Sequence, residues 1–167
     1  MSPTDQERQL TTELQALYAW ADAEVGAFSP RCDASGKCCR FKEYGHRLYL
    51  CQIEARHLLQ AAPLWTMPAD EGGCPFQIDG LCSQRETRPL GCRVYFCDPS
   101  FSGAMEAIME EGIRRLKEIT DRHALGWDYA SLHTFLNDPA RAAITAPPSL
   151  NENLPCDTLP RSLPLVS

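Results

Sequence analysis

Cysteine is the residue type with the clearest chemistry in this chain, which has nine cysteines in 167 residues. Eight of them lie between residues 32 and 97, and the ninth, Cys156, lies apart from the others. Thiolate sulfur is a strong, soft ligand for zinc and for the iron of iron–sulfur clusters. So high a density of cysteine therefore indicates a thiolate metal centre or a disulfide framework.

The N-terminal residues favour the metal centre. They show no basic segment followed by an apolar stretch, which is the pattern of a secretion signal. We therefore expect a cytoplasmic location, where thiols stay reduced and ligate metals more often than they form disulfides. We expect no membrane contact either, because no apolar run approaches the roughly 20 residues that cross a bilayer.

The formal net charge is −6, which gives no general reason to expect binding to nucleic acid. Residues 31–97 carry a net charge of +2, from nine Lys and Arg against seven Asp and Glu, whereas the segments on either side carry −4 each. Basic side chains near a thiolate centre would offset its negative charge and lower the pKa of its thiols. A chance scatter of surface charge is an equally good interpretation.

Seven cysteines fall into an ordered series of short motifs. A tetrahedral site needs four ligands that converge on one point. Cys32, Cys38 and Cys39 would supply one half of such a site, and Cys92 and Cys97 the other half. Cys74 and Cys82, which lie between these groups in the chain, would complete that site or build a second one. The spacing matches neither paired C-x-x-C motifs nor the bacterial ferredoxin series, so zinc and an iron–sulfur cluster both stay open. In chain order these candidate ligands are Cys32, Cys38, Cys39, Cys74, Cys82, Cys92 and Cys97.

This order of motifs resembles the YkgJ-type cysteine-cluster family, also described as the CxxCxxCC or zinc/iron-chelating domain family. The resemblance covers residues 31–98. The matching segments are Cys32-x-x-Ser35-Gly36-Lys37-Cys38-Cys39, Cys74-Pro75-Phe76, Cys82, and Arg88-Pro89-x-x-Cys92-Arg93 with Cys97.

The resemblance implies that these cysteines chelate zinc or an iron–sulfur cluster. It specifies neither a reaction nor a protein partner, so a metal ion is the one partner that we expect. Relatives carry the name Fe–S oxidoreductase, and a lysine N-methylase that acts on flagellin carries a related domain. The alternative function is therefore an iron–sulfur redox enzyme or a methylase-like enzyme that modifies proteins.

The chain departs from the family pattern at Ser35, where the family has its second cysteine. A serine hydroxyl is a poor ligand for zinc or iron at neutral pH. Cys51 lies outside the motifs and is a candidate metal ligand that would replace it. The alternative is that Cys51 is a buried thiol that packs as a small apolar side chain.

Two arginines flank Cys92 in the last motif. Arg88 and Arg93 are candidates to bind the cofactor, either by hydrogen bonds to its sulfur atoms or by offsetting its charge. For Arg88, the alternative is an ion pair with an acidic residue such as Glu86. His46 is a further candidate to support the site from outside the ligand shell. The chain has no glycine-rich phosphate-binding motif, so we do not expect a nucleotide cofactor.

Apolar residues recur at helical spacing in four stretches, and Thr4 with Glu7 forms a capping-box pattern before the first of them. The predicted helices span 5–28, 52–62, 102–123 and 128–136, and a short strand spans 48–51. We expect Gly126 to end the third helix and Asp128 to cap the fourth. The predicted buried stripe of the first helix is Leu10, Leu14, Leu17, Ala21, Val25 and Phe28.

The dipeptide Asp79-Gly80 between two short apolar stretches predicts a β-hairpin. In the register that a two-residue turn imposes, Ile78 faces Leu81 and Gln77 faces Cys82. Cys74 therefore does not lie directly opposite Cys82, and the chain has to bend at Pro75 if both cysteines are to reach one metal.

These elements predict a mainly helical α+β fold with an irregular cysteine-rich metal-binding centre, packed between N- and C-terminal helices. We expect a single metal-binding domain at 1–138 with its motif core at 31–98. Residues 139–167 hold six prolines and are expected to form a tail, in which Cys156 takes no part in the site.

Overall fold

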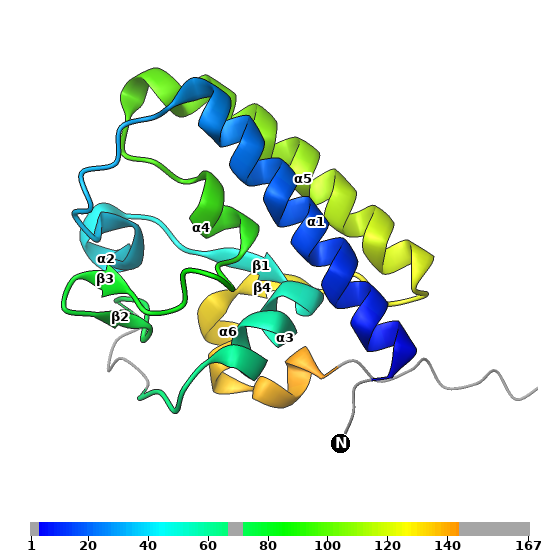
Figure 1. Cartoon of the computed structure of the whole chain (residues 1–167). Coiled ribbons are helices and arrows are strands. Elements are labelled where there is room, and N and C mark those ends of the chain that lie inside the picture. The colour runs from blue at the N-terminus through cyan, green and yellow to red at the C-terminus, as the bar shows by residue number, and fades with distance from the viewer. Residues whose placement is uncertain (1–3, 67–71, 144–167) are drawn as a thin grey trace, which may run out of the picture.

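The computed structural model describes residues 4–66 and 72–143, and these residues form the mainly helical α+β fold that the sequence predicts (Figure 1). Cys156 and the tail from residue 144 onward lie outside the described residues. The helices are α1 (Asp5–Phe28), α2 (Phe41–Tyr44), α3 (Gln52–Ala61), α4 (Leu90–Val94), α5 (Ser102–Arg122) and α6 (Leu132–Asn137), with 3₁₀ helices η1 (Lys37–Cys39), η2 (Pro99–Phe101) and η3 (Pro139–Ala142). The strands are β1 (Tyr49–Cys51), β2 (Gln77–Ile78), β3 (Leu81–Cys82) and β4 (Tyr129–Ser131).

Helix α1 begins where the sequence predicts, because a capping box closes its first turn. The Glu7 N–H donates to the Thr4 hydroxyl at 3.2 Å, and the Thr4 N–H donates to the Glu7 carboxylate at 2.6 Å. The predicted stripe of this helix is buried except for Phe28, which is 58% exposed. Tyr18, which the apolar pattern did not include, is buried instead.

The two long helices lie side by side and antiparallel (Figure 1). The end of α5 meets the beginning of α1, where Arg122 forms an ion pair with Glu13 at 2.6 Å. Nearby, the Gln6 side chain donates to the carbonyl of His123 at 3.2 Å. The segments that hold the cysteines lie on one side of this helix pair.

The hairpin of β2 and β3 has the predicted register. Gln77 lies opposite Cys82, and Ile78 lies opposite Leu81. The turn residues Asp79 and Gly80 have φ values of 50° and 78°, which a two-residue hairpin turn requires of both positions.

The helix predicted at 128–136 is wrong in its first part. Tyr129–Ser131 forms strand β4, which pairs antiparallel with β1, and α6 begins only after it with Ser131 as its N-cap. Asp128 is not a cap; its carboxylate pairs with Arg141 at 2.6 Å. Pairing with a strand that is distant in the chain overrides the local helical pattern.

The third helix ends within one residue of its predicted end, but its predicted cap is wrong. Helix α5 ends at Arg122, and the residue with left-handed backbone that follows it is Ala124, with a φ of 52°, rather than Gly126. The Leu125 N–H turns back to donate to the Thr120 carbonyl at 2.9 Å, and Leu125 is buried. This local closure ends the helix before the glycine is reached.

The packed part of the chain continues past Asp138, where the sequence placed the end of the domain. Helix η3 packs on α3 and α6. The Gln52 side chain donates to the carbonyls of Arg141 at 2.9 Å and of Ala143 at 3.0 Å. These bonds fix residues 139–143 against the body of the molecule.

Two clusters of buried side chains hold the elements together. The first lies between α1, α4 and α5 and includes Cys51, while the second joins α3 and α6 to Phe41 and Phe76. Cys74 and Cys92 pack against the second cluster. Among the helices of the described residues, none is long and apolar enough to cross a membrane.

Candidate metal centre

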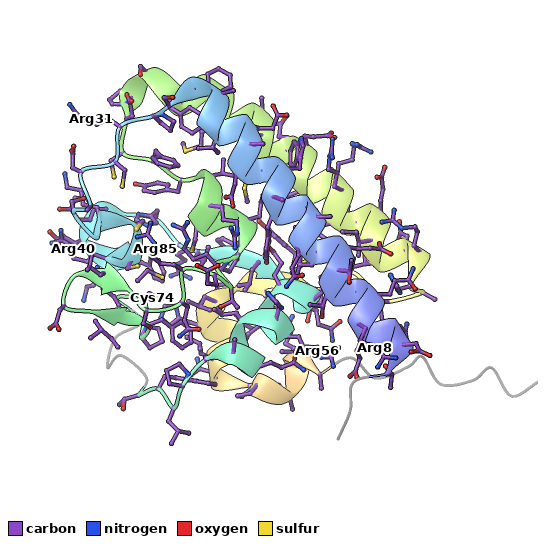
Figure 2. All side chains as sticks on the ribbon, in the orientation of Figure 1. Arg8, Arg31, Arg40, Arg56, Cys74 and Arg85 are labelled. Atoms are coloured by element: carbon purple, nitrogen blue, oxygen red, sulfur yellow. The ribbon has the colours of Figure 1, made fainter. Side chains whose placement is uncertain are left out.

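All seven cysteines of the motif series line one cavity of about 190 Å³, which we call the thiol cavity. They come from the loop before η1, from η1 itself, from the turn before β2, from β3, from α4 and from the segment after α4. In the view of Figure 2, Cys74, Arg31, Arg40 and Arg85 lie on the same side of the molecule, and Arg8 and Arg56 lie toward the opposite side. The fold therefore gathers residues that are up to 65 positions apart, from Cys32 to Cys97.

A backbone hydrogen bond joins the first and second motifs. The Cys74 N–H donates to the Cys39 carbonyl at 2.8 Å. The chain then turns at Pro75, because the Gln77 N–H donates to the Cys74 carbonyl at 3.2 Å. This turn is the bend that the sequence required, and it places Cys74 and Cys82 on the wall of one cavity.

Gly36 allows the first motif to lie directly on the hairpin. Its φ is +67°, and its carbonyl accepts a hydrogen bond from the Gln77 side chain at 2.9 Å. A Cβ at this position would lie 2.5 Å from the carbonyl oxygen of Gly80, closer than any side chain tolerates. Only glycine permits this approach, which sets the position of Cys38 and Cys39 just after it.

Helix α4, which carries Cys92, is held at its N-terminus by a buried carboxylate. Glu54 is 1% exposed, and its Oε1 accepts the Leu90 N–H at 2.7 Å and the Tyr18 hydroxyl at 3.2 Å. Leu90 is the first residue of α4, so this bond satisfies a free N–H at the N-terminus of the helix. Five residues would not form a stable helix on their own, and this contact fixes the helix in place.

Cys32 and Cys97 are the exposed cysteines of the cavity. The Arg31 N–H donates to the Asp98 carboxylate at 3.0 Å, which ties the two chain segments together next to these cysteines. Burial raises the pKa of Tyr95, and the neighbouring Cys97 thiol, with which its hydroxyl forms a hydrogen bond, raises it further. These residues form the rim between the cavity and solvent.

The inner thiols hold their protons strongly. Cys38 and Cys39 place their sulfur atoms 4.0 Å apart, and the hydrogen bond between them raises the pKa of Cys38. That same bond lowers the pKa of Cys39, but Cys74 and burial outweigh it and raise that pKa to about 12. Burial raises the pKa of Cys92 as well. A cation in the cavity would reverse this balance, because a metal ion deprotonates the thiols that it binds.

Positive charge collects around the thiol cavity, although the chain as a whole is acidic. Four basic side chains line it against a single acidic one, Asp33. The Cys39 hydrogen bond raises the pKa of Cys38 and burial raises that of Cys92, and the charge of Arg88 opposes both rises. The sequence singled out only Arg88 of these four, but each of the others lies within three residues of a motif cysteine. The basic lining consists of Arg31, Lys37, Arg85 and Arg88.

Arg93 does not line the thiol cavity. Its guanidinium donates to the carbonyls of Arg88 at 2.8 Å and Glu86 at 2.6 Å, and it forms an ion pair with Asp22 at 2.7 Å. It also lies over the ring of Tyr18 at 4.3 Å. Arg93 therefore joins the last motif to α1, and its contacts within the described residues do not include a thiol of the cavity.

Cys51 lies away from the other cysteines, in the hydrophobic core, with no exposed surface. Its N–H donates to the Glu54 carboxylate at 3.1 Å, three residues into α3. Burial, followed by the charge of Glu54, raises the pKa of its thiol. This placement matches the packed thiol that the sequence offered as the alternative to a metal ligand.

His46 contacts the backbone of the first motif. Its Nε2 lies 3.2 Å from the Cys38 carbonyl oxygen, and its ring stacks on Tyr95 at 5.0 Å. Its Nδ1 is buried without a hydrogen-bond partner among the described residues. The histidine therefore contacts the backbone of a candidate ligand, as a supporting residue would.

Within residues 4–66 and 72–143, no group of three or more His, Cys, Asp or Glu side chains stands ready to hold a metal ion. The donor chemistry nevertheless fits a thiophilic metal, since seven thiols share one cavity. Zinc with four sulfur ligands at about 2.3 Å places neighbouring sulfurs roughly 3.8 Å apart. The 4.0 Å separation of the Cys38 and Cys39 sulfurs is close to that edge length.

Comparison of the chain with protein-family models, with curated protein sequences and with solved structures found no match in any of the three.

Proposed function

We propose that the thiol cavity is a thiolate metal centre and that zinc is the metal it holds. One observation carries the proposal: seven cysteines from separate segments line a single cavity of about 190 Å³. Two of these sulfurs already stand at nearly the separation that a tetrahedral zinc site requires. The resemblance to the cysteine-cluster family points to the same chemistry.

The surroundings of the cavity suit an anionic centre. Four thiolates on a divalent ion leave a charge of −2, and the four basic side chains of the lining offset it. Arg88 is the basic residue that we assign this role, because it acts on two of the inner thiols. When bound, the metal supplies a cross-link between motifs that otherwise meet through few backbone bonds.

The burial of the cysteines suggests how a metal enters and leaves. Cys39 is buried, whereas Cys32 and Cys97 are exposed at the mouth of the cavity. Exposed thiols can pass a metal to or from another thiol carrier by ligand exchange, and inner thiols retain it. We therefore propose a metal-holding role with exchange through the mouth, in a reducing compartment such as the cytoplasm.

An iron–sulfur cluster is the second candidate, and with it a redox or protein-modifying activity. It is compatible with the same lining, because such a cluster takes four thiolate ligands and the cavity offers seven thiols. Metal and acid-labile sulfide analysis of protein purified without oxygen tests both candidates. Zinc without sulfide supports the zinc centre, whereas iron with sulfide and a visible absorption band supports the cluster. Protein that binds neither metal overturns the proposal.

A further inference from the structure

A second cavity of about 410 Å³ adjoins the thiol cavity, and no part of the proposed metal centre uses it. The two cavities share Cys38, Leu48, Cys92 and Tyr95 as a common wall. The volume lies in the range of small-molecule binding sites, about 300 to 1,000 Å³. We call it the tyrosine–methionine cavity, after the residues that dominate its lining: Tyr49, Tyr95, Tyr129, Met105, Met109 and Ile113.

One wall of this cavity is a face of α5. Met105, Met109 and Ile113 recur every four residues along the helix and remain only partly buried. Gly91 lies opposite, and a Cβ there would lie 2.9 Å from Leu48 and 3.8 Å from Met109. Methionine side chains adapt to the shape of apolar ligands, and glycine leaves room beside them.

The opposite wall is aromatic. Tyr49 and Tyr129 stack with ring centres 6.0 Å apart, and Trp127 stacks on Tyr129 at 5.6 Å. Tyr49 is 45% exposed, so part of this stacked series faces outward. Aromatic faces attract organic cations as well as apolar groups.

The charged residues of the lining determine the sign of the charge that a ligand should carry. Glu106 and Glu110 both line the cavity, one turn apart on α5, against Arg47 as the one Lys or Arg of the lining. Neither carboxylate forms an ion pair or hydrogen bond within the described part of the chain. Two like charges at this spacing repel each other.

Two other acidic residues of the same helix do have partners. Glu111 pairs with Arg114 at 2.7 Å and with Arg115 at 2.8 Å, and Glu118 also pairs with Arg114. Among the described residues, Glu106 and Glu110, which border the cavity, lack such partners, as does Asp121 farther along the helix. A bound cation would supply the missing partner.

We propose that the tyrosine–methionine cavity binds a small organic cation with an apolar body, such as an aryl-alkyl amine. The apolar body contacts the methionines and tyrosines, and the ammonium group lies toward Glu106 and Glu110. This places the ligand against Cys38 and Cys92, on the far side of the wall from the other thiols. The proposal does not require that the thiol cavity holds a metal.

Calorimetric titration of the full chain with 2-phenylethylamine tests the proposal, with 2-phenylethanol and 3-phenylpropanoate as neutral and anionic probes of similar body. We expect the amine to bind with a Kd below about 1 mM and the other two to bind more weakly. Replacing both carboxylates, in Glu106→Gln/Glu110→Gln, should weaken amine binding about three- to tenfold. The matched control, Glu111→Gln/Glu118→Gln, removes the same charge from another face of α5 and should leave the Kd unchanged.

Met109→Trp provides a second test, because the larger side chain fills the cavity and should abolish amine binding. Absence of amine binding in the native chain overturns the proposal. Equal binding of amine and alcohol, or equal loss in both double variants, overturns it as well. Each titration is run on zinc-loaded and on zinc-free protein, and the zinc content is measured separately. A protein that binds amine but no metal would refute only the metal centre, and the reverse result would refute only this inference.

Discussion

The carboxylate of Glu54 accepts a hydrogen bond from the backbone N–H of Leu90 at 2.7 Å, and this bond joins the helix after β1 to the helix that carries Cys92. The same carboxylate accepts the Cys51 N–H and the Tyr18 hydroxyl. Glu54 of α3 thus links α1 and α4 through hydrogen bonds to both. The position of a candidate metal ligand therefore depends on a side chain that does not touch the cavity.

Replacing Glu54 by Gln should destabilise the fold. The side-chain oxygen of glutamine can still accept the Leu90 N–H. Its NH₂ group would then replace the oxygen that accepts the Cys51 N–H, and that N–H loses its acceptor. Leaving one buried donor unsatisfied costs about 1–3 kcal/mol. Urea unfolding measures the loss, and Glu24→Gln on the exposed face of α1 is the control, with an expected change below about 0.5 kcal/mol. Equal stability of the two variants would show that Glu54 does not hold α4.

Stability should also depend on the ionisation of Glu54. Burial raises the pKa of this carboxyl, and the hydrogen bonds from Leu90, Cys51 and Tyr18 only partly offset that effect. Because its pKa is higher in the native state, Glu54 binds its proton more tightly there than in the unfolded chain. This contributes to the free energy of unfolding in full at pH values below the unfolded pKa of about 4.3. This contribution is lost as the pH rises through the higher native value.

Urea unfolding of zinc-free protein from about pH 4 to 7 measures this dependence. The native chain should lose stability relative to Glu54→Gln as the pH rises, because the glutamine cannot ionise. Carboxylates common to both proteins cancel in the difference. A native chain that gains stability relative to the variant over this range would contradict the raised pKa.

Arg93 should matter for stability and not for metal binding. Arg93→Lys keeps one charge but loses the fork that reaches the carbonyls of Arg88 and Glu86 together, so we expect a loss of about 2–3 kcal/mol. Arg114→Lys, in an exposed set of ion pairs, is the control and should change stability by less than about 1 kcal/mol. The folded Arg93→Lys protein should keep its full metal content. A selective loss of metal would return Arg93 to the cofactor site.

Gly36 and Gly45 offer a matched pair, since both have a φ of +67°. The left-handed backbone makes alanine unfavourable by roughly 1 kcal/mol at each position. Only at Gly36 would the alanine Cβ also clash, because it would lie 2.5 Å from the Gly80 carbonyl oxygen. Gly36→Ala should therefore reduce metal affinity and stability, while Gly45→Ala lowers stability alone. Competition with a chromogenic chelator measures the affinity. Identical affinities would show that the contact between loop and hairpin does not shape the site.

The elements that the sequence predicted correctly are those set by neighbouring residues. The capping box at Thr4 and Glu7 and the hairpin turn at Asp79-Gly80 need only local bonds, and both are present. The strand at Tyr129–Ser131 was mistaken for a helix because its partner, β1, is distant in the chain. Helix α4 was missed because its short length requires a cap from Glu54, far away in sequence.

The candidate site was predictable to the same degree. Motif order predicted seven candidate ligands in one or two sites, and the structure places all seven on one cavity. The roles of Cys51 and Arg93 depend on burial and on contacts with α1 and α3, which spacing does not reveal. The second cavity is lined by residues of β1, α4, α5 and β4, which are distant in the chain, and no motif marks it.

We propose that the cavity thiols, and not the buried core thiol, hold a metal. The most direct test is the metal content per chain of Cys92→Ser and Cys51→Ser, purified without oxygen beside the native protein. Cys38→Ser is measured too, in case the Cys92 variant fails to fold by circular dichroism. We expect a loss of metal in the two cavity variants and native metal content in Cys51→Ser. Native metal content in both cavity variants, or loss of metal in Cys51→Ser alone, would contradict it.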